Sequence, residues 1–144
     1  MFGDVADYQR FLSSLERFCG GTEVKICAYC LLMENHIHLL VCDPEGHTSL
    51  IMKKPDVSYS QYFNLKYDRS GHLLQDRYKT EAIENNAYLL VVFRYILNNP
   101  RMAGICEARN YPWSSYARYD RTPAFMELYG TFAGVLSAWW AGAV

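Results

Sequence analysis

Two histidines, His36 and His38, stand two positions apart in a run of residues that is otherwise suited to a buried strand. Side chains of a strand alternate between its two faces, so residues i and i+2 point the same way. Two neutral imidazoles on one face can bind a single divalent cation. A bare pair of this kind is more often an ordinary surface pair, because short motifs match by chance. The metal interpretation therefore needs a second feature of the chain to support it.

Tyr95 and Asn99, further along the chain, provide that second feature. The apolar residues before them recur at steps of three and four, which predicts a helix with Tyr95 and Asn99 on one face. Pro100 should end this helix, because the residue before a proline is disfavoured in the α region. A phenol can attack a phosphodiester when a cation polarises the phosphate, and the Asn99 amide oxygen could be a third ligand of that cation. The ordinary alternative is a core tyrosine followed by an asparagine at a helix C-terminus.

These side chains need a strand pair and a helix to position them, and the sequence predicts both. Helices are expected at residues 5–18, at 48–67 with an interruption at Pro55 and a restart near 58, and at 85–98, with short helices after them. Strands are expected at 23–32, 35–42 and 73–83, with a Gly20-Gly21 stop before the first and a turn at 43–46. Thr48 or Ser49 should cap the second helix. Helices alternating with antiparallel strands on one sheet make an α+β fold.

Several motifs, in the same order along the chain, resemble those of the single-tyrosine HUH transposases. Residues 33–41 are similar to the family's Met-Pro-Asn-His-x-His-Leu-Leu-Val, with Glu34 in place of proline. Residues 71–79 are similar to its Gly-x-Leu-(Trp/Phe)-Gln-x-Arg-(Phe/Tyr)-Lys, and residues 95–104 to its Tyr-Ile-x-x-Asn-Pro-Val-x-Ala-Gly. Residues 111–116, Tyr-Pro-Trp-Ser-Ser-Tyr, complete the series. The resemblance covers about residues 5–119 and is greatest to the REP-associated tyrosine transposases of the IS200-like family.

The resemblance implies a single domain over residues 1–144 with a ferredoxin-like antiparallel sheet and helices on one face. The family usually has a strand before the first helix, whereas this chain begins at or just before the helix. The implied metal ligands are His36, His38 and Asn99, and the implied nucleophile is Tyr95. The implied substrate is single-stranded, hairpin-forming DNA, cut through a 5′-phosphotyrosine intermediate with Mg²⁺ or Mn²⁺, the fairly hard cations that such a ligand set suits. A homodimer is a further expectation from the family.

The distribution of charge is consistent with DNA binding, although the net charge is −1. Residues 1–50 hold three Lys/Arg against seven Asp/Glu, whereas residues 51–101 hold eight against five, so the basic residues gather near the proposed site. We therefore expect these eight to contact the DNA backbone: Lys53, Lys54, Lys66, Arg69, Arg77, Lys79, Arg94 and Arg101. The alternative is a solvated helix face with its aromatic residues turned into the core.

Composition restricts the remaining classes. A chain of 144 residues, 51% apolar and 20% charged, fits a globular protein that has no membrane span or signal peptide and is expected in the cytoplasm. The five cysteines fit reduced thiols. A zinc set of Cys27, Cys30, His36 and His38 is disfavoured, because residues three apart in a strand face opposite sides of the sheet. Two other classes stay open: an inactive transposase remnant that only binds DNA, and a small metal-binding module.

Overall fold

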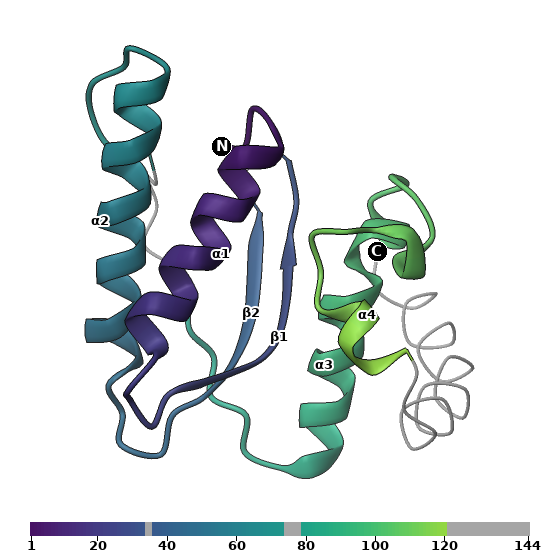
Figure 1. Ribbon diagram of the computed structural model, residues 1–144. Coiled ribbons are helices and arrows are strands. Elements are labelled where there is room, and N and C mark those ends of the chain that lie inside the picture. Colours follow the sequence, from purple (N-terminus) through teal and green to yellow (C-terminus); the bar gives the residue numbers. More distant parts are fainter. Residues whose placement is uncertain (34–35, 74–78, 121–144) are drawn as a thin grey trace. The chain divides into compact units, whose positions relative to one another are not determined.

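The computed structural model describes residues 1–33, 36–73 and 79–120 and shows a mixed α+β protein (Figure 1). The element order is α1 (Val5–Cys19), β1 (Lys25–Leu31), β2 (Ile37–Cys42), α2 (Thr48–Lys66), α3 (Asn86–Met102), the 3-10 helix η1 (Ala108–Asn110) and α4 (Tyr116–Tyr119). The predicted α+β class is confirmed, with a two-stranded antiparallel sheet. No strand precedes α1 in the described residues, as expected. None of the described helices is long and apolar enough to cross a bilayer.

The chain forms two compact units. Unit 1 comprises Met1–Cys27 and Leu31–Glu81, and unit 2 comprises Ala28–Cys30 and the chain from Ala82 onward. Strand β1 is shared, because its ends belong to unit 1 and its middle belongs to unit 2. Each unit is therefore described by itself below, and the single domain over residues 1–144 stays a prediction.

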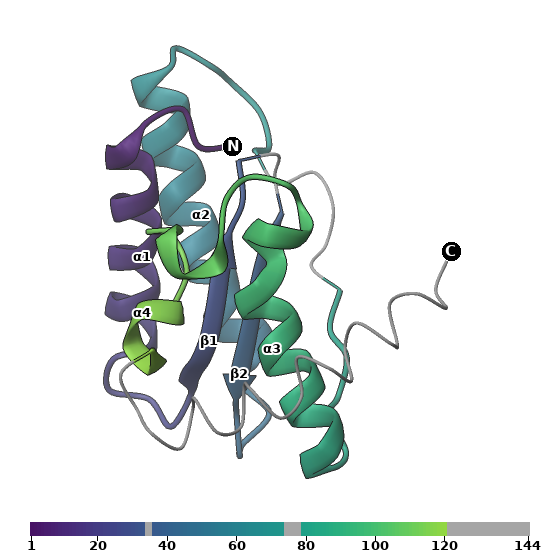
Figure 2. The ribbon, with the colours of Figure 1, turned by 90° about the vertical axis from the view of Figure 1, so that its right-hand side faces the viewer.

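Unit 1 is built on helices α1 and α2, which pack side by side on the same face of the β1–β2 hairpin (Figures 1 and 2). Their interface is aromatic: the Phe2 and Tyr8 rings stack with centroids 4.3 Å apart, and Phe11 meets Tyr59 edge to face at 5.3 Å. All four side chains are buried, as is Leu15 one turn further along α1. Burial of large rings stabilises such a small core strongly, so the residues before α1 belong to it as well.

The hairpin agrees closely with its prediction. Both strands lie within their expected ranges of 23–32 and 35–42, and the Leu32 N–H donates to the His36 carbonyl at 2.8 Å. Turn residues follow β2, with Gly46 at a φ of 74° that a side chain would disfavour. Residues 34 and 35, which include Glu34, lie outside the described part of the chain.

Helix α2 differs from its prediction in two ways. It runs without a break through Pro55, because a proline removes only one helical hydrogen bond and this ring is fully buried. Its first turn is not capped by Thr48 or Ser49. Instead, Asp43 accepts hydrogen bonds from both the N–H and the hydroxyl of Thr48 at 2.6 Å. The Asp43 side chain, on the other side of the turn, thus takes the place of the cap that the sequence predicted at Thr48 or Ser49.

The strand expected at 73–83 is wrong wherever the chain is described. Residues 79–83 are irregular and mostly exposed, so they offer no buried face for a sheet to stabilise, and residues 74–78 lie outside the described ranges. Helix α3 begins as expected, with the Asn85 side chain accepting from the Tyr88 N–H at 2.8 Å. It continues past Pro100 to Met102, so the predicted stop was wrong. At the end of α3, the Ala103 N–H donates a hydrogen bond to the Asn99 carbonyl at 2.9 Å.

Candidate active site

The two histidines lie side by side at the start of β2. His36 is exposed just before the strand, His38 is partly buried within it, and their ring centroids are 6.4 Å apart with planes 18° from parallel. Burial, and then the neighbouring His36, lower the pKa of His38. A lowered pKa keeps an imidazole nitrogen unprotonated at neutral pH, which is the form that binds a cation. The predicted common face is therefore seen, and its donors suit a metal.

Cys27 and Cys30, the cysteines of the alternative zinc set, have thiols with raised pKa values. Burial raises the pKa of the Cys27 thiol, with a further contribution from Cys42, and burial raises that of Cys30 to about 12. Both cysteines lie in β1, where residues three apart face opposite sides of the sheet, so they do not converge on one ion. Across the described ranges, no three His, Cys, Asp or Glu side chains group as a metal site.

Tyr95 and Asn99 occupy successive turns of α3. Tyr95 is 36% exposed, whereas Asn99 is 8% exposed and its Nδ2 donates to the Tyr95 carbonyl at 3.4 Å. No group in the described part of the chain donates a hydrogen bond to the Asn99 Oδ1. An amide oxygen in this state can serve as a ligand for Mg²⁺ or Mn²⁺. The helix thus presents a phenol beside an available amide.

The structure brings together the members of each pair. His36 and His38 belong to unit 1, and Tyr95 and Asn99 belong to unit 2. That the two pairs converge on one cation stays a prediction.

Comparison with known proteins covers the stretch of sequence that contains these four residues. The family model described as Transposase IS200 like matches residues 2–99, which is more than half of the chain. This chain belongs to the IS200-like transposase family. The matched region contains the histidine pair of the transposase and ends at Asn99. No curated protein and no solved structure matches closely enough to add to this finding. The family implies a DNA-cleaving enzyme, so DNA is its partner.

The eight basic residues of the transposase fall into distinct surroundings. Lys53 and Lys54 are exposed on α2, and Lys79 is exposed before α3. The Arg69 guanidinium lies 5.9 Å from the centroid of the Phe63 ring. These positions leave the charges open to a phosphate backbone.

The other basic residues are differently placed. Exposed Arg101 approaches Glu107 at 3.8 Å, a separation typical of a weak surface pair. Arg94 is 1% exposed within unit 2, so its charge is not presented to solvent. Arg77 lies outside the described residues. Arg94 is therefore better described as an interior side chain of unit 2 than as a residue that contacts DNA.

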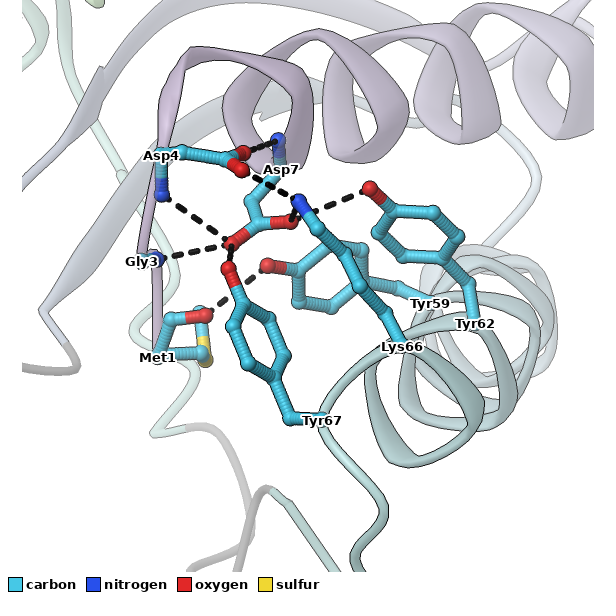
Figure 3. Close-up of polar contacts among 8 residues, drawn as sticks. All are labelled: Met1, Gly3, Asp4, Asp7, Tyr59, Tyr62, Lys66 and Tyr67. Atoms are coloured by element: carbon cyan, nitrogen blue, oxygen red, sulfur yellow. Dashed lines mark hydrogen bonds and ion pairs between the residues drawn. The ribbon is translucent and has the colours of Figure 1, made fainter.

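Lys66 is held by carboxylates rather than open to DNA (Figure 3). Its Nζ lies 2.6 Å from Asp4 Oδ2 and 2.7 Å from Asp7 Oδ1. Burial lowers the pKa of Lys66, but hydrogen bonds to Asp4 and Asp7 outweigh it and raise the pKa overall. The lysine thus neutralises a buried acid, a role that the charge distribution along the sequence did not suggest.

Asp7 is the centre of this group, which we call the Asp7 cluster. It is fully buried and also forms a capping box with Asp4 at the start of α1. Burial raises its pKa, but the hydrogen bonds from Lys66 and Tyr67 outweigh burial and hold the pKa far below the usual range. The five groups that donate to its carboxylate are the Gly3 N–H, the Asp4 N–H, the Tyr62 hydroxyl, the Lys66 ammonium and the Tyr67 hydroxyl.

The Asp7 cluster joins the segment before α1 to the end of α2. The Tyr59 hydroxyl adds a hydrogen bond to the Met1 carbonyl at 2.8 Å (Figure 3). The sequence carried one local sign of this cluster, the Asp4-x-x-Asp7 spacing of a capping box. Its partners on α2 come from far along the chain and could not be paired with it from sequence.

Proposed function

We propose that this protein is a single-tyrosine transposase that cuts and rejoins single-stranded DNA through a 5′-phosphotyrosine link. The observation that carries the proposal is the pairing of Tyr95 with Asn99 on α3, inside a family match that also contains His36 and His38. The Tyr95 phenol is partly exposed, so a phosphodiester can reach it. Membership of the transposase family implies that this phosphodiester belongs to DNA. The resemblance of its motifs further suggests hairpin DNA of the REP type as the substrate.

His36, His38 and Asn99 are the residues that would hold a divalent cation, either Mg²⁺ or Mn²⁺. Two imidazoles and an amide oxygen leave positions for phosphate oxygens and water, which suits a fairly hard cation. When bound, such a cation withdraws charge from the phosphate that is attacked. The lowered pKa of His38 fits this role, because its nitrogen need not lose a proton first at neutral pH.

Tyr95 supplies the nucleophile in this proposal. Its oxygen forms a bond to phosphorus while the bond between phosphorus and the 3′ oxygen breaks, and the phenol proton ends on the released 3′ hydroxyl. The 5′ phosphate is then linked to Tyr95. Attack by a 3′ hydroxyl on that link reverses the step and joins DNA again. Because the phosphotyrosine link keeps the free energy of the broken phosphodiester bond, no nucleotide cofactor is required for rejoining.

The exposed basic residues would bind the DNA backbone. Lys53, Lys54, Arg69, Lys79 and Arg101 are accessible for this, whereas Lys66 and Arg94 have other roles in their units. Contact between Arg77 and DNA stays a prediction from the distribution of basic residues along the sequence. A homodimer and a cytoplasmic location also stay predictions.

A DNA-binding protein without catalysis is the second candidate. It is favoured by the small sheet of the described residues, which has two strands. A reduced sheet need not prevent DNA from binding to exposed lysines. It would, however, remove support for the strand that carries the histidines.

A labelling experiment separates the two candidates. The purified chain is incubated with Mn²⁺ and single-stranded hairpin oligonucleotides labelled at the 5′ or the 3′ end, and a denaturing gel is examined for a covalent protein–DNA band. We expect label from the strand 3′ of the cut on the protein, abolished by Tyr95→Phe and by His36→Ala. Tyr88→Phe, on the same helix, should leave the band unchanged. DNA that is bound but never cut by the wild type would favour the inactive remnant.

A further inference from the structure

The Tyr-Pro-Trp-Ser-Ser-Tyr motif has no part in the chemistry proposed above, yet it returns the chain to strand β1. Ser114 forms an isolated antiparallel bridge with Cys30. Ser115 follows and lies against Tyr29, the residue before Cys30. All four residues are buried and belong to unit 2. A short segment that is not itself a strand therefore occupies the outer edge of β1.

Ser115 replaces the partner strand at this edge with both its backbone and its side chain. Its N–H donates to the Tyr29 carbonyl at 3.0 Å, and its Oγ accepts from the Tyr29 N–H at 2.9 Å. The hydroxyl also lies 3.4 Å from the Tyr29 carbonyl. Ser115 is 2% exposed and Tyr29 is 9% exposed, so water does not readily replace these bonds. A buried N–H left without an acceptor is costly, so the Ser115 hydroxyl has a defined task.

Ser114 is a neighbour of the same type that lacks this task. Its hydroxyl donates to the Tyr111 carbonyl at 3.4 Å and accepts from the Tyr116 N–H at 3.3 Å, both within its own segment. It is 5% exposed and thus nearly as buried as Ser115. The two serines differ in their side-chain hydrogen bonds: the Ser115 hydroxyl bonds to Tyr29 of β1, and the Ser114 hydroxyl bonds only within its own segment.

We infer that Ser115 is a positioning residue for strand cleavage, an inference that rests on the proposed function. It fixes the middle of β1 to the unit that carries Tyr95. Only a few residues of sequence separate the end of β1 at Leu31 from His36 and His38. A strand that can shift at this edge would leave both the histidines and Tyr95 intact but would spoil their alignment for attack, and small misalignments of reacting groups lower rates strongly.

The test compares Ser115→Ala with Ser114→Ala, two variants that each lose one buried hydroxyl. Single-turnover formation of the covalent band is followed at saturating hairpin DNA and Mn²⁺, with DNA affinity and thermal unfolding measured alongside. We expect Ser115→Ala to lower the rate constant about tenfold or more while DNA affinity stays within about threefold. Ser114→Ala and Ser115→Thr, which keeps the hydroxyl, should keep rate constants within about threefold of the wild type.

The rate constant separates positioning from loss of folded protein. A variant that merely unfolds in part gives less product at the wild-type rate constant. That result for Ser115→Ala would overturn the inference, as would equal slowing of the Ser114 and Ser115 alanine variants, or a Ser115→Thr variant as slow as Ser115→Ala. If the wild type binds the DNA but forms no covalent band, the proposed function itself fails and this inference fails with it.

Discussion

Replacing the central carboxylate of the Asp7 cluster should lower the stability of unit 1. Asp7→Asn keeps the shape of the side chain and one acceptor oxygen, which can still serve the three donors on the Oδ2 side. Its amide group would face the Lys66 ammonium, so the ion pair at 2.7 Å is lost and the remaining bonds lose their charge. A hydrogen bond to a charged group contributes about 1.5–3 kcal/mol, so we expect a loss of about 2–3 kcal/mol.

Asp4→Asn is a matched control for this change. Asp4 also contacts Lys66, but its side chain is 51% exposed, and an asparagine caps a helix as well as an aspartate does. We therefore expect a loss of less than about 1 kcal/mol, as for other exposed ion pairs. Urea unfolding at pH 7, followed by circular dichroism, measures both variants. Equal midpoints for the wild type and Asp7→Asn, or equal losses in the two variants, would refute this account of the cluster.

The difference in stability between the wild type and Asp7→Asn should also depend on pH. The pKa of Asp7 is lowered in the folded protein from an ordinary value of 3.8, so its contribution is fully present well above that pH. It is lost as the pH falls below about 4, where the unfolded chain takes up the proton and the folded chain does not. The difference between the wild type and Asp7→Asn should therefore be constant from pH 7 to 5 and shrink in stronger acid.

Three further changes test other parts of the structure. Burial raises the pKa of Asp56 to about 6, so the wild type loses stability as the pH rises from about 4 through 6, and Asp56→Asn should be more stable by about 1–3 kcal/mol at pH 7 in urea unfolding. Gly3→Ala should lower the thermal midpoint, because its Cβ would collide with a hydroxyl of the Asp7 cluster; an unchanged midpoint would contradict this. Replacing Lys53 and Lys54 by Gln should weaken single-stranded DNA binding and reduce its salt dependence by about 0.7 per residue, whereas Lys66→Gln should leave the salt dependence unchanged, as filter binding over a salt series would show.

Local patterns were sufficient to predict much of unit 1. The helix expected at residues 5–18 and the hairpin after it are confirmed within two residues, because amphipathic spacing, a Gly-Gly stop and alternating apolar residues all act over short distances. The common face of His36 and His38 followed from the strand alone. The position of Tyr95 one turn before Asn99 followed from the helix alone.

The errors arose where distant contacts decide the outcome. Pro55 and Pro100 disfavour a helix locally, but both rings are buried and both helices continue through them. The strand at 73–83 was suggested by its residue types, but residues 79–83 lack a buried face. A strand needs a partner and a core, and neither can be read from its own residues.

The candidate site shows the same limit. A count of basic residues along the chain selected Lys66 and Arg94, although one neutralises Asp7 and the other is buried. The charge of a residue is visible in the sequence, whereas its partners are fixed by tertiary structure. The task of Ser115 was likewise hidden, because its partner Tyr29 is far away along the chain.

The most direct test of the central claim is to identify the residue that carries the DNA. The covalent product formed with Mn²⁺ and hairpin DNA is digested with nuclease and trypsin, and the nucleotide-bearing peptide is sequenced by mass spectrometry. We predict a 5′ nucleotide phosphate on Tyr95 and on none of the other eleven tyrosines. A nucleotide on another residue, or cleavage of the DNA with no protein-bound nucleotide, would contradict the proposed mechanism.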